Sequence, residues 1–336
     1  MNIQTLDKID KQKMHQVYDK WPEIAKKSYK LEKNTVNFEN IEDIVFGGMG
    51  GSGAIGDMFQ SILSKTKIHV NVVKGYTLPE TVNLNTLVII TSVSGNTSET
   101  LSLLKSAKKI GSKIIAFSSG GKIQEFCIKN NIKFILVSKY HSPRATFPSF
   151  LYTMLKVLSK TLKIREDNII KSIKELEIIQ KKICSSNLTE SNISLNLAKS
   201  IKLIPIIYYP WGLKSASIRF KNSLQENAKI HASSEDIIEA SHNGVVAWEK
   251  KSYVIPILVR GNNDHIKTKE RFEIIKEFFI EKEIKYEEII SIEGNILSKL
   301  ITLIYLLDYA TIYKAIIDNI DPSPVNSIDF IKNKLQ

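Results

Sequence analysis

The hydrophobic pattern along the first half of the chain changes repeatedly between two kinds of segment. Short runs rich in Ile, Val and Phe predict buried strands, and longer stretches with apolar residues three or four positions apart predict helices. This alternation is typical of βα units arranged around a mostly parallel sheet. The predicted strands cover residues 44–46, 68–73, 87–91, 113–117 and 133–137, and the predicted helices cover 54–64, 98–110 and 122–129.

The second half of the chain repeats this order, with predicted strands at 203–209, 253–259 and 285–290 and predicted helices at 215–229 and 267–282. The segment IVFGGMGGSGAIG parallels IIYYPWGLKSASI, because each reads as a strand, a glycine turn and a helix start. We therefore expect an α/β protein built from two similar domains in tandem, each a mostly parallel sheet flanked by helices. The expected divisions are an N-terminal helical segment (1–40), a first domain (41–162), a helical connector (163–202) and a second domain with a C-terminal helix (203–336).

Composition places the chain among folded, soluble proteins. It has 336 residues, of which 43% are hydrophobic and 24% charged, and its formal net charge is +12. The positive charge favours an anionic partner, which could be a phosphorylated metabolite, a nucleic acid or an acidic surface. The two cysteines, Cys127 and Cys184, lie far apart without CxxC spacing, so neither a disulfide framework nor a cysteine metal site is expected. A polar N-terminal stretch without a secretory signal and a reducing setting together predict a cytoplasmic protein.

The most apolar stretch covers residues 297–317 and raises the question of a membrane span. It carries Lys299, Asp308 and Lys314, which would be costly in hydrocarbon. We interpret it as a core helix and expect no membrane association.

The first glycine turn, Gly48 to Gly53, formally matches the GxGxxG fingerprint of dinucleotide-binding proteins. That fingerprint also requires an acidic residue at the end of the next strand, where this chain has Lys74. NAD is therefore disfavoured, although Lys74 leaves an opening for a 2′-phosphate, and a Walker-type loop is absent because no GKS or GKT follows. In isolation, close packing of strand and helix explains these glycines as well as a ligand site does.

A second turn, SVSGNTSET at residues 92–100, carries several hydroxyl residues around one glycine just before a predicted helix. Backbone N–H groups, hydroxyl donors and the positive end of a helix dipole together form a phosphate site that needs no lysine. A helix cap explains one hydroxyl but not several. A third turn, SSGGK at residues 118–122, follows the next strand with similar chemistry, and all three turns are expected at one edge of the sheet.

The first turn, from Gly48 to Ser52, and the second turn at residues 92–100 together resemble the sugar isomerase (SIS) domain, a flavodoxin-like fold that binds phosphosugars. Further motifs resemble, in order, those of the bifunctional phosphoglucose/phosphomannose isomerases, and the resemblance extends from about residue 44 to residue 332. These motifs are Pro143-Arg144-Ala145, Gln225-Glu226-Asn227-Ala228-Lys229, Glu239-Ala240-Ser241-His242-Asn243-Gly244 and Asp321-Pro322-Ser323-Pro324-Val325, followed by Lys332.

The resemblance implies a role for each matching residue. Glu226 would move a proton between C1 and C2, Arg144 would stabilise the enediolate, and His242 would assist ring opening. It also implies a homodimer in which His242 reaches the site of the neighbouring subunit, with Lys332 as a C-terminal helper. The implied phosphate-binding residues are Gly51, Ser52, Ser92, Ser94 and Thr97.

Each of these residues could also have a purely structural or surface role. Glu226 could pair with Lys229 on a solvated helix face, Arg144 could face solvent, and a C-terminal lysine is usually surface. His242 precedes Asn-Gly and is therefore expected on a turn, which suits a side chain that projects into a site.

The resemblance further implies that a small hydroxyl residue, in place of a larger amide, admits mannose 6-phosphate. Both Ser323 and Ser327 are candidates for that residue.

The expected function is a cofactor-free, metal-free isomerase that interconverts glucose 6-phosphate, fructose 6-phosphate and mannose 6-phosphate through a cis-enediol(ate). One alternative is a non-catalytic SIS regulator, but the first forty residues are too short and irregular for a DNA-reading three-helix domain, so no nucleic-acid partner is expected. Another alternative is a different SIS sugar-phosphate enzyme, which would not be expected to carry both the ENAK and the EASHN motif. A nicotinamide-dependent dehydrogenase is the last alternative.

Overall fold

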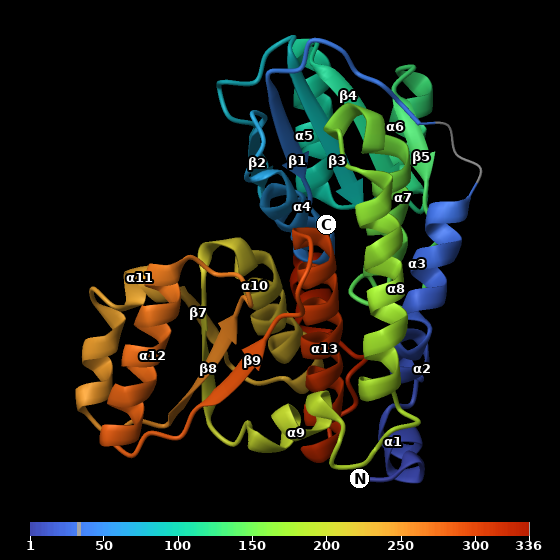
Figure 1. Cartoon of the computed structure of the whole chain (residues 1–336). Helices are drawn as coiled ribbons and strands as arrows, with labels where there is room; N and C mark the ends of the chain where they lie inside the picture. The colour runs from blue at the N-terminus through green and yellow to red at the C-terminus, as the bar shows by residue number, and fades with distance from the viewer. Residues whose placement is uncertain (32–34, 336) are drawn as a thin grey trace. The chain divides into compact units, whose positions relative to one another are not determined.

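The computed structural model describes residues 1–31 and 35–335 and divides the chain into two compact units (Figure 1). We call them the β1–β5 unit and the β6–β9 unit after their sheets. The β1–β5 unit comprises Lys20–Glu177 and Gly294–Ile301. The β6–β9 unit comprises Met1–Asp19, Ile178–Glu293 and Thr302–Gln336. The domain boundaries expected from the sequence stay a prediction.

The sheet of the β1–β5 unit has five parallel strands in the order β2-β1-β3-β4-β5. Every residue of its central strand, β3, is buried, as expected for a strand covered by helices on both faces. Chain order reverses between β1 and β3, and such a reversal is where flavodoxin-like folds bind ligands. The strands are β1 (Asp43–Gly47), β2 (His69–Val73), β3 (Thr86–Ser92), β4 (Lys113–Ser118) and β5 (Lys133–Leu136).

Helices cover both faces of this sheet. Leu103 and Leu104 of α5 and Ile123 of α6 pack on one face with Val88 and Ile90 of β3. On the other face, α4 contacts α7, which in turn packs against α3. The helices are α3 (Trp21–Lys30), α4 (Gly50–Leu63), α5 (Ser98–Ile110), α6 (Gly121–Lys129) and α7 (Phe147–Leu162), while α8 (Glu166–Ile183) continues into the β6–β9 unit.

The sheet of the β6–β9 unit has four parallel strands in the order β7-β6-β8-β9, which matches the first four positions of the other sheet. The tandem repeat predicted from the sequence is therefore present as two similar parallel sheets. The strands are β6 (Ile204–Tyr209), β7 (Ser233–Asp236), β8 (Val254–Arg260) and β9 (Glu287–Ile290).

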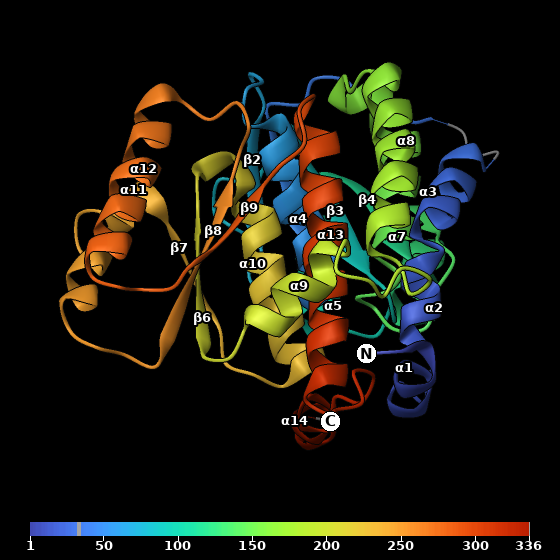
Figure 2. The same cartoon turned by 60° about the horizontal axis from the view of Figure 1, so that its bottom comes forward.

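In Figure 2, α11 and α12 lie on one side of this sheet and α10 lies on the other. Phe272 and Phe279 of α12 pack with Tyr208 and Leu258 of the sheet and with Trp248. The helices of this unit are α1 (Ile3–Ile9), α2 (Met14–Asp19), α9 (Ile193–Ser200), α10 (Lys214–Ser223), α11 (Ile237–Ala240), α12 (Ile266–Glu281) and α14 (Asn326–Lys334). Shorter 3₁₀ turns occupy Trp211–Leu213 and Gly244–Glu249.

Helix α13 (Ile296–Ile317) is long and apolar enough to cross a membrane, but 89% of its most hydrophobic window is buried within the protein. Its charged residue Asp308 is fully buried and pairs with the buried Arg219 at 2.6 Å. Helix α13 is thus a core helix, as the sequence predicts, of the kind found in soluble proteins.

The structure differs from the sequence predictions at two places in this unit. The strand β7 was not predicted, because Ser233-Ser234-Glu235-Asp236 has no apolar or β-branched residue and pairs only with β6. The helix predicted over residues 215–229 ends as an α-helix at Ser223 and continues as a π-helical turn over Leu224–Ala228.

Candidate active site

The first glycine turn lies at the carboxyl end of β1 and is closely packed at Gly51 and Gly53. A Cβ on Gly53 would lie 2.8 Å from the carbonyl oxygen of Gly48, and one on Gly51 would lie 3.3 Å from that of Pro143. These glycines therefore serve close packing, and they bring the start of α4 against the Pro143-Arg144 backbone.

The serine turn at the carboxyl end of β3 is held by its own hydroxyl groups. The Oγ of Ser92 accepts a hydrogen bond from the Gly95 N–H at 3.1 Å and lies 3.2 Å from the Oγ1 of Thr97. Gly95 has φ +70°, a left-handed conformation that favours glycine. Ser52, from the first turn, accepts a hydrogen bond from the Val93 N–H at 3.3 Å. The first two turns are thereby joined.

The third turn packs against the serine turn and is hydrogen-bonded to it. The Lys122 N–H donates to Oδ1 of Asn96 at 3.0 Å, and the Ile123 N–H donates to the Gly95 carbonyl at 2.9 Å. A Cβ on Gly121 would lie 2.7 Å from the Ser94 carbonyl oxygen. All three turns lie at the same edge of the sheet, as the sequence predicts, but these contacts indicate that the third turn shapes the second.

Only some of the hydroxyl groups at this edge of the sheet are accessible to solvent. Ser92 is only 2% exposed and Ser52 only 6%, whereas Ser94 is exposed and Thr97 is half-buried. The side chain of Thr97 makes no capping hydrogen bond to α5. The first N–H groups of α5 and the positive end of its dipole lie beside Ser94 and Thr97, which is an arrangement chemically suited to an anion.

Arg144 lies beside this edge on the loop that precedes α7. It is 4% exposed, so the guanidinium does not simply face solvent. The loop is fixed by Thr146, whose Oγ1 donates to the Tyr140 carbonyl and accepts from the Tyr140 N–H at 3.0 Å. Helix α7 begins at Phe147. A buried cation beside the serine turn is suited to stabilising negative charge on a bound molecule.

Lys74, which left an opening for a 2′-phosphate, forms an ion pair with Asp57 of α4 at 2.5 Å. This pairing uses the lysine within the unit and weakens the nicotinamide interpretation further.

Three candidate residues belong to the β6–β9 unit. Glu226 is half-buried in the π-helical turn that follows α10. His242 is exposed on a turn after α11, as its Asn-Gly context predicts, and its N–H donates to the Glu239 carbonyl at 2.9 Å. Lys332 is exposed on α14, a helix without buried residues. The three therefore lie on three separate elements.

A carboxylate that the sequence analysis did not single out, Glu235, lies against the His242 turn. A Cβ on Gly244 would lie 2.7 Å from Oε2 of Glu235, so the Glu235 carboxylate lies directly beside the Gly244 backbone. Burial, and then the charge of Glu239, raises the pKa of Glu235 above its ordinary value. Glu235 lies on strand β7, which the sequence did not predict.

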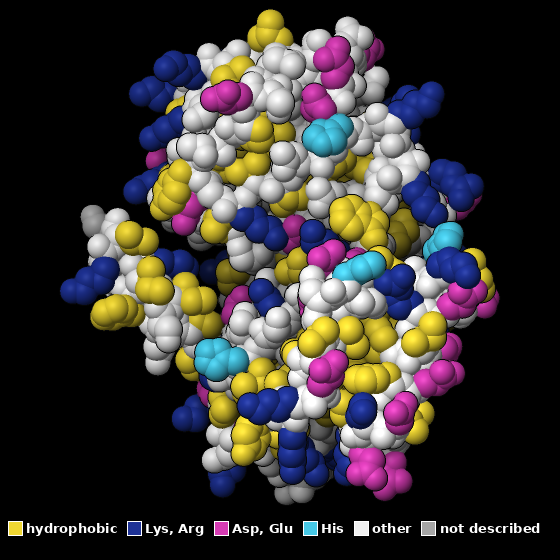
Figure 3. Space-filling view, turned by 90° about the vertical axis from the view of Figure 1, so that its left-hand side faces the viewer, with side chains coloured by type: hydrophobic (Ala, Val, Ile, Leu, Met, Phe, Trp, Pro, Cys, Tyr) yellow, Lys and Arg dark blue, Asp and Glu magenta, His cyan; other side chains and the backbone are white. Residues whose placement is uncertain are grey.

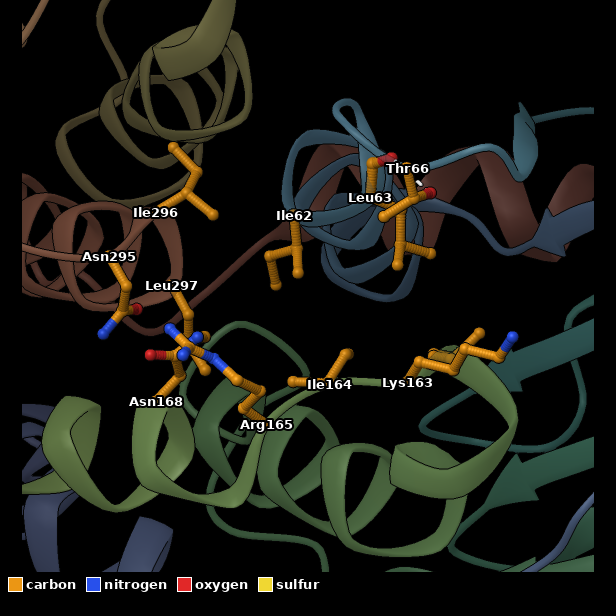
Figure 4. A pocket seen from close by; sticks show the side chains of 11 residues that line it. Ile62, Leu63, Thr66, Lys163, Ile164, Arg165, Asn168, Asn295, Ile296 and Leu297 are labelled. Carbon is orange, nitrogen blue, oxygen red and sulfur yellow. Dashed lines mark hydrogen bonds between the residues drawn. The ribbon is translucent and has the colours of Figure 1, made fainter.

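A pocket of about 320 Å³ lies elsewhere in the β1–β5 unit (Figure 4). Ile62 and Leu63 from the end of α4 and Ile164 from the loop before α8 form part of its apolar wall. Ser52 lies in the first turn of α4 and Leu63 is its last residue, so the length of this 14-residue helix separates the pocket from the serine turn. The pocket contains none of the candidate site residues.

Two further observations bear on the chemistry. Among residues 1–31 and 35–335, no group of three His, Cys, Asp or Glu side chains is arranged to hold a metal ion. On the face drawn in Figure 3, Lys and Arg side chains are interspersed with Asp and Glu and form no continuous basic surface.

Family comparisons agree with this arrangement. The family described as "SIS domain" matches residues 38–147, and the one described as "Bacterial phospho-glucose isomerase C-terminal SIS domain" matches residues 190–335. Among solved structures, the fold resembles the C-terminal domain of glucosamine-fructose-6-phosphate aminotransferase from Francisella tularensis, with a TM-score of 0.69 and 16% identity over 93% of this chain and 98% of that one. It also resembles tagatose-6-phosphate ketose/aldose isomerase from Escherichia coli, with a TM-score of 0.64 and 16% identity over 85% of each chain.

Sequence relatives are more specific. A bifunctional phosphoglucose/phosphomannose isomerase from Caldicellulosiruptor bescii is 33% identical over 94% of this chain and 96% of its own length. One from Thermoplasma acidophilum is 27% identical over 91% of this chain and 96% of its own length. With tandem SIS folds, the serine turn at the switch point and this near-complete coverage, the chain belongs to the bifunctional phosphoglucose/phosphomannose isomerase family.

Proposed function

We propose that this protein is an aldose–ketose isomerase that interconverts glucose 6-phosphate and fructose 6-phosphate, and also mannose 6-phosphate and fructose 6-phosphate. The observation that carries the proposal is the serine turn beside the buried Arg144 at the switch point of the β1–β5 sheet. Together they offer a phosphate site and a fixed cation near it, and the family membership of the chain supports the choice of substrate.

The phosphate is proposed to bind at the N-terminus of α5. Ser94 and Thr97 supply accessible hydroxyl groups, and Gly51 lets the start of α4 approach closely. Ser52 and Ser92 are buried and hydrogen-bonded within the turns, so we assign to them the shape of the site as much as direct contact.

The reaction moves the carbon-bound proton between C2 and C1 and a hydroxyl proton between O2 and O1, and it requires no cofactor or metal. Glu226 takes the proton from C2 of the open-chain aldose and returns it to C1, or the reverse for the ketose. The electron pair left by that proton forms the cis-enediolate, whose negative oxygen Arg144 stabilises. His242 assists opening of the sugar ring, and Lys332 is a C-terminal helper. Loss of stereochemistry at C2 in the planar intermediate is what lets glucose and mannose epimers share one ketose product.

We further propose a cytoplasmic homodimer in which His242 contributes to the site of the partner subunit. The exposed position of His242 supports this arrangement. So does α14, on which Phe330 is 64% exposed and Ile331 57% exposed, because such apolar side chains are commonly covered by another subunit. In this setting the enzyme would serve glycolysis, gluconeogenesis or the supply of mannose phosphates.

The test is an assay of the purified protein with fructose 6-phosphate, in which glucose 6-phosphate and mannose 6-phosphate are detected separately by coupled dehydrogenases. Both products are expected. If only glucose 6-phosphate forms, the proposed mannose 6-phosphate activity is overturned. If no product forms, the isomerase assignment is overturned. A relative from Sulfolobus acidocaldarius, 27% identical over 73% of this chain, is named D-glucosamine-6-phosphate 4-epimerase, so glucosamine 6-phosphate should be included as a comparison substrate.

A further inference from the structure

Glu226 is carried by a π-helical turn that interrupts the end of α10. The turn covers Leu224–Ala228 and ends at Lys229, which has φ +58°, and the N–H of Lys229 donates to the Leu224 carbonyl. A π-helical turn accommodates one extra residue, is rare and is frequently found at functional sites. We therefore expect neighbouring residues to stabilise this turn.

The first support lies three residues before Glu226. Ser223 donates from its Oγ to Oδ1 of Asp308 on α13 at 2.8 Å. The other carboxylate oxygen of Asp308 accepts hydrogen bonds from Nε and Nη2 of Arg219 at 2.9 and 2.6 Å and from the Tyr18 hydroxyl at 3.2 Å. Asp308 is fully buried and Arg219 is 3% exposed. The carboxylate of Asp308 thus fixes two residues of α10 at once.

The second support lies directly after Glu226. Asn227 donates from Nδ2 to Oγ1 of Thr311 at 2.7 Å, and Thr311 in turn donates to the Asp308 carbonyl at 2.6 Å. Both Asn227 and Thr311 are fully buried. Asp308 and Thr311 are one helical turn apart on α13, so both supports arise from one rigid surface.

Glu226 also lies within reach of the charge of Arg219. Burial opposes the charged guanidinium, but Asp308, Tyr18 and Glu226 together raise the pKa of Arg219 above its ordinary value. Asp308 binds Arg219 through two hydrogen bonds.

From these contacts we propose that Asp308 and Thr311 are positioning residues that hold the π-helical turn, through Ser223 and Asn227, so that Glu226 is presented to the substrate as the base. This inference rests on the proposed isomerase function. We call the hydrogen bonds Ser223–Asp308 and Asn227–Thr311 the two tethers. Neither Asp308 nor Thr311 needs to contact substrate for this role.

The experiment removes each tether with a small change in the full-length enzyme. Ser223→Ala removes the first tether and Thr311→Val removes the second, while Thr311→Ser keeps the hydroxyl. Ser217→Ala is the matched control, because Ser217 lies on the same helix, is buried, and its Oγ has no hydrogen-bond partner within the described part of the chain. Steady-state kcat and KM are measured for fructose 6-phosphate and for glucose 6-phosphate deuterated at C2, and folding is followed by circular dichroism and Tm.

A displaced base slows proton transfer without weakening binding. Ser223→Ala and Thr311→Val should therefore lower kcat on the order of 10–100-fold with KM within about twofold of the wild type. The primary isotope effect should rise because proton transfer becomes more rate-limiting. Thr311→Ser and Ser217→Ala should stay within about twofold of the wild type in kcat.

The proposal is overturned if both tether variants fold and keep kcat within about twofold of Ser217→Ala, or if kcat falls without a rise in the isotope effect. Either result with an active wild type leaves the isomerase assignment intact. A wild type without isomerase activity would instead overturn the proposed function, and with it the role of Glu226 that the tethers serve.

Discussion

The Oγ of Ser52 accepts a hydrogen bond from the backbone N–H of Val93 at 3.3 Å, and this contact joins the turn after β1 to the turn after β3. These are the two strands between which chain order reverses in the sheet. Val93 itself is buried, so its side chain points away from the exposed surface of the turn. The proposed phosphate site is thus formed by the turns after two neighbouring strands, which the Ser52 side chain joins.

Alanine substitutions of Ser92 and Ser94 should differ in their effects on stability and on KM. Ser92 is buried and accepts a hydrogen bond that shapes the turn, so Ser92→Ala should lower the free energy of unfolding by about 1 kcal/mol as well as raise KM. Ser94 is exposed, so Ser94→Ala should raise KM for fructose 6-phosphate about tenfold with little change in stability. Urea unfolding and steady-state kinetics of both variants test this, and equal effects of both substitutions on KM and stability would contradict it.

Gly95→Ala should disrupt the serine turn. The added Cβ would lie 1.7 Å from the carbonyl oxygen of Gly120, and Gly95 has φ +70°. We expect a loss of more than about 2 kcal/mol in the free energy of unfolding, together with loss of phosphate binding. Gly75→Ala is the control, because a Cβ there has no neighbour within 4 Å, and it should change stability by less than about 0.5 kcal/mol. Similar stabilities of the two variants would show that the turn tolerates the side chain.

Asp10 and His15 should make the β6–β9 unit sensitive to acid. Oδ2 of the buried Asp10 lies 2.7 Å from Nδ1 of His15 and accepts the His15 N–H at 2.8 Å. Burial alone would raise the pKa of Asp10, but these hydrogen bonds outweigh it and lower the pKa below the ordinary value of 3.8. An acid with a lowered pKa in the folded state stabilises the protein above its unfolded-state pKa, and this stabilisation is lost as the pH falls through the folded-state pKa.

The measurement compares urea unfolding of the wild type and Asp10→Asn between pH 7 and pH 3. The wild type should be more stable at neutral pH by about 1–3 kcal/mol, and the difference should shrink as the pH falls below about 4. A difference that stays constant over this range would contradict the role assigned to the Asp10 charge.

Much of this molecule could be predicted from its sequence. The alternation of apolar runs predicted eight of the nine strands in the described structure, and the tandem similarity predicted two parallel sheets. Strand β7 was missed because a polar edge strand is formed by pairing with β6, which a local pattern does not contain. The π-helical turn at Glu226 was missed for a related reason, since Asp308 and Thr311 support it from more than eighty positions away.

The candidate site was only partly predictable from the sequence. The hydroxyl-rich turn pointed to phosphate because several donors follow one another in the sequence. Which of those donors stay accessible could not be predicted, because that depends on how Ser52 and Ser92 are used within the fold.

Ser323 should influence mannose 6-phosphate more than Ser327 does. Ser323 is 7% exposed and directly follows Pro322, whose carbonyl accepts a hydrogen bond from Nζ of Lys229 at 3.3 Å at the end of the Glu226 turn. Ser327 is exposed on α14. Ser323→Gln should lower kcat/KM for mannose 6-phosphate by about tenfold relative to glucose 6-phosphate, and Ser327→Gln should not change this ratio. An unchanged ratio in Ser323→Gln, or the reverse order of effects, would assign epimer tolerance to another residue.

The central claim is proton transfer by Glu226, and isomerisation in D₂O tests it most directly. The wild type, incubated with fructose 6-phosphate and followed by NMR, should incorporate deuterium at C2 of glucose 6-phosphate and mannose 6-phosphate. Glu226→Gln should bind fructose 6-phosphate with nearly unchanged affinity but lower both turnover and deuterium incorporation by about 10³-fold or more, because only the base is removed. Products free of deuterium, or near wild-type turnover in Glu226→Gln, would contradict the account.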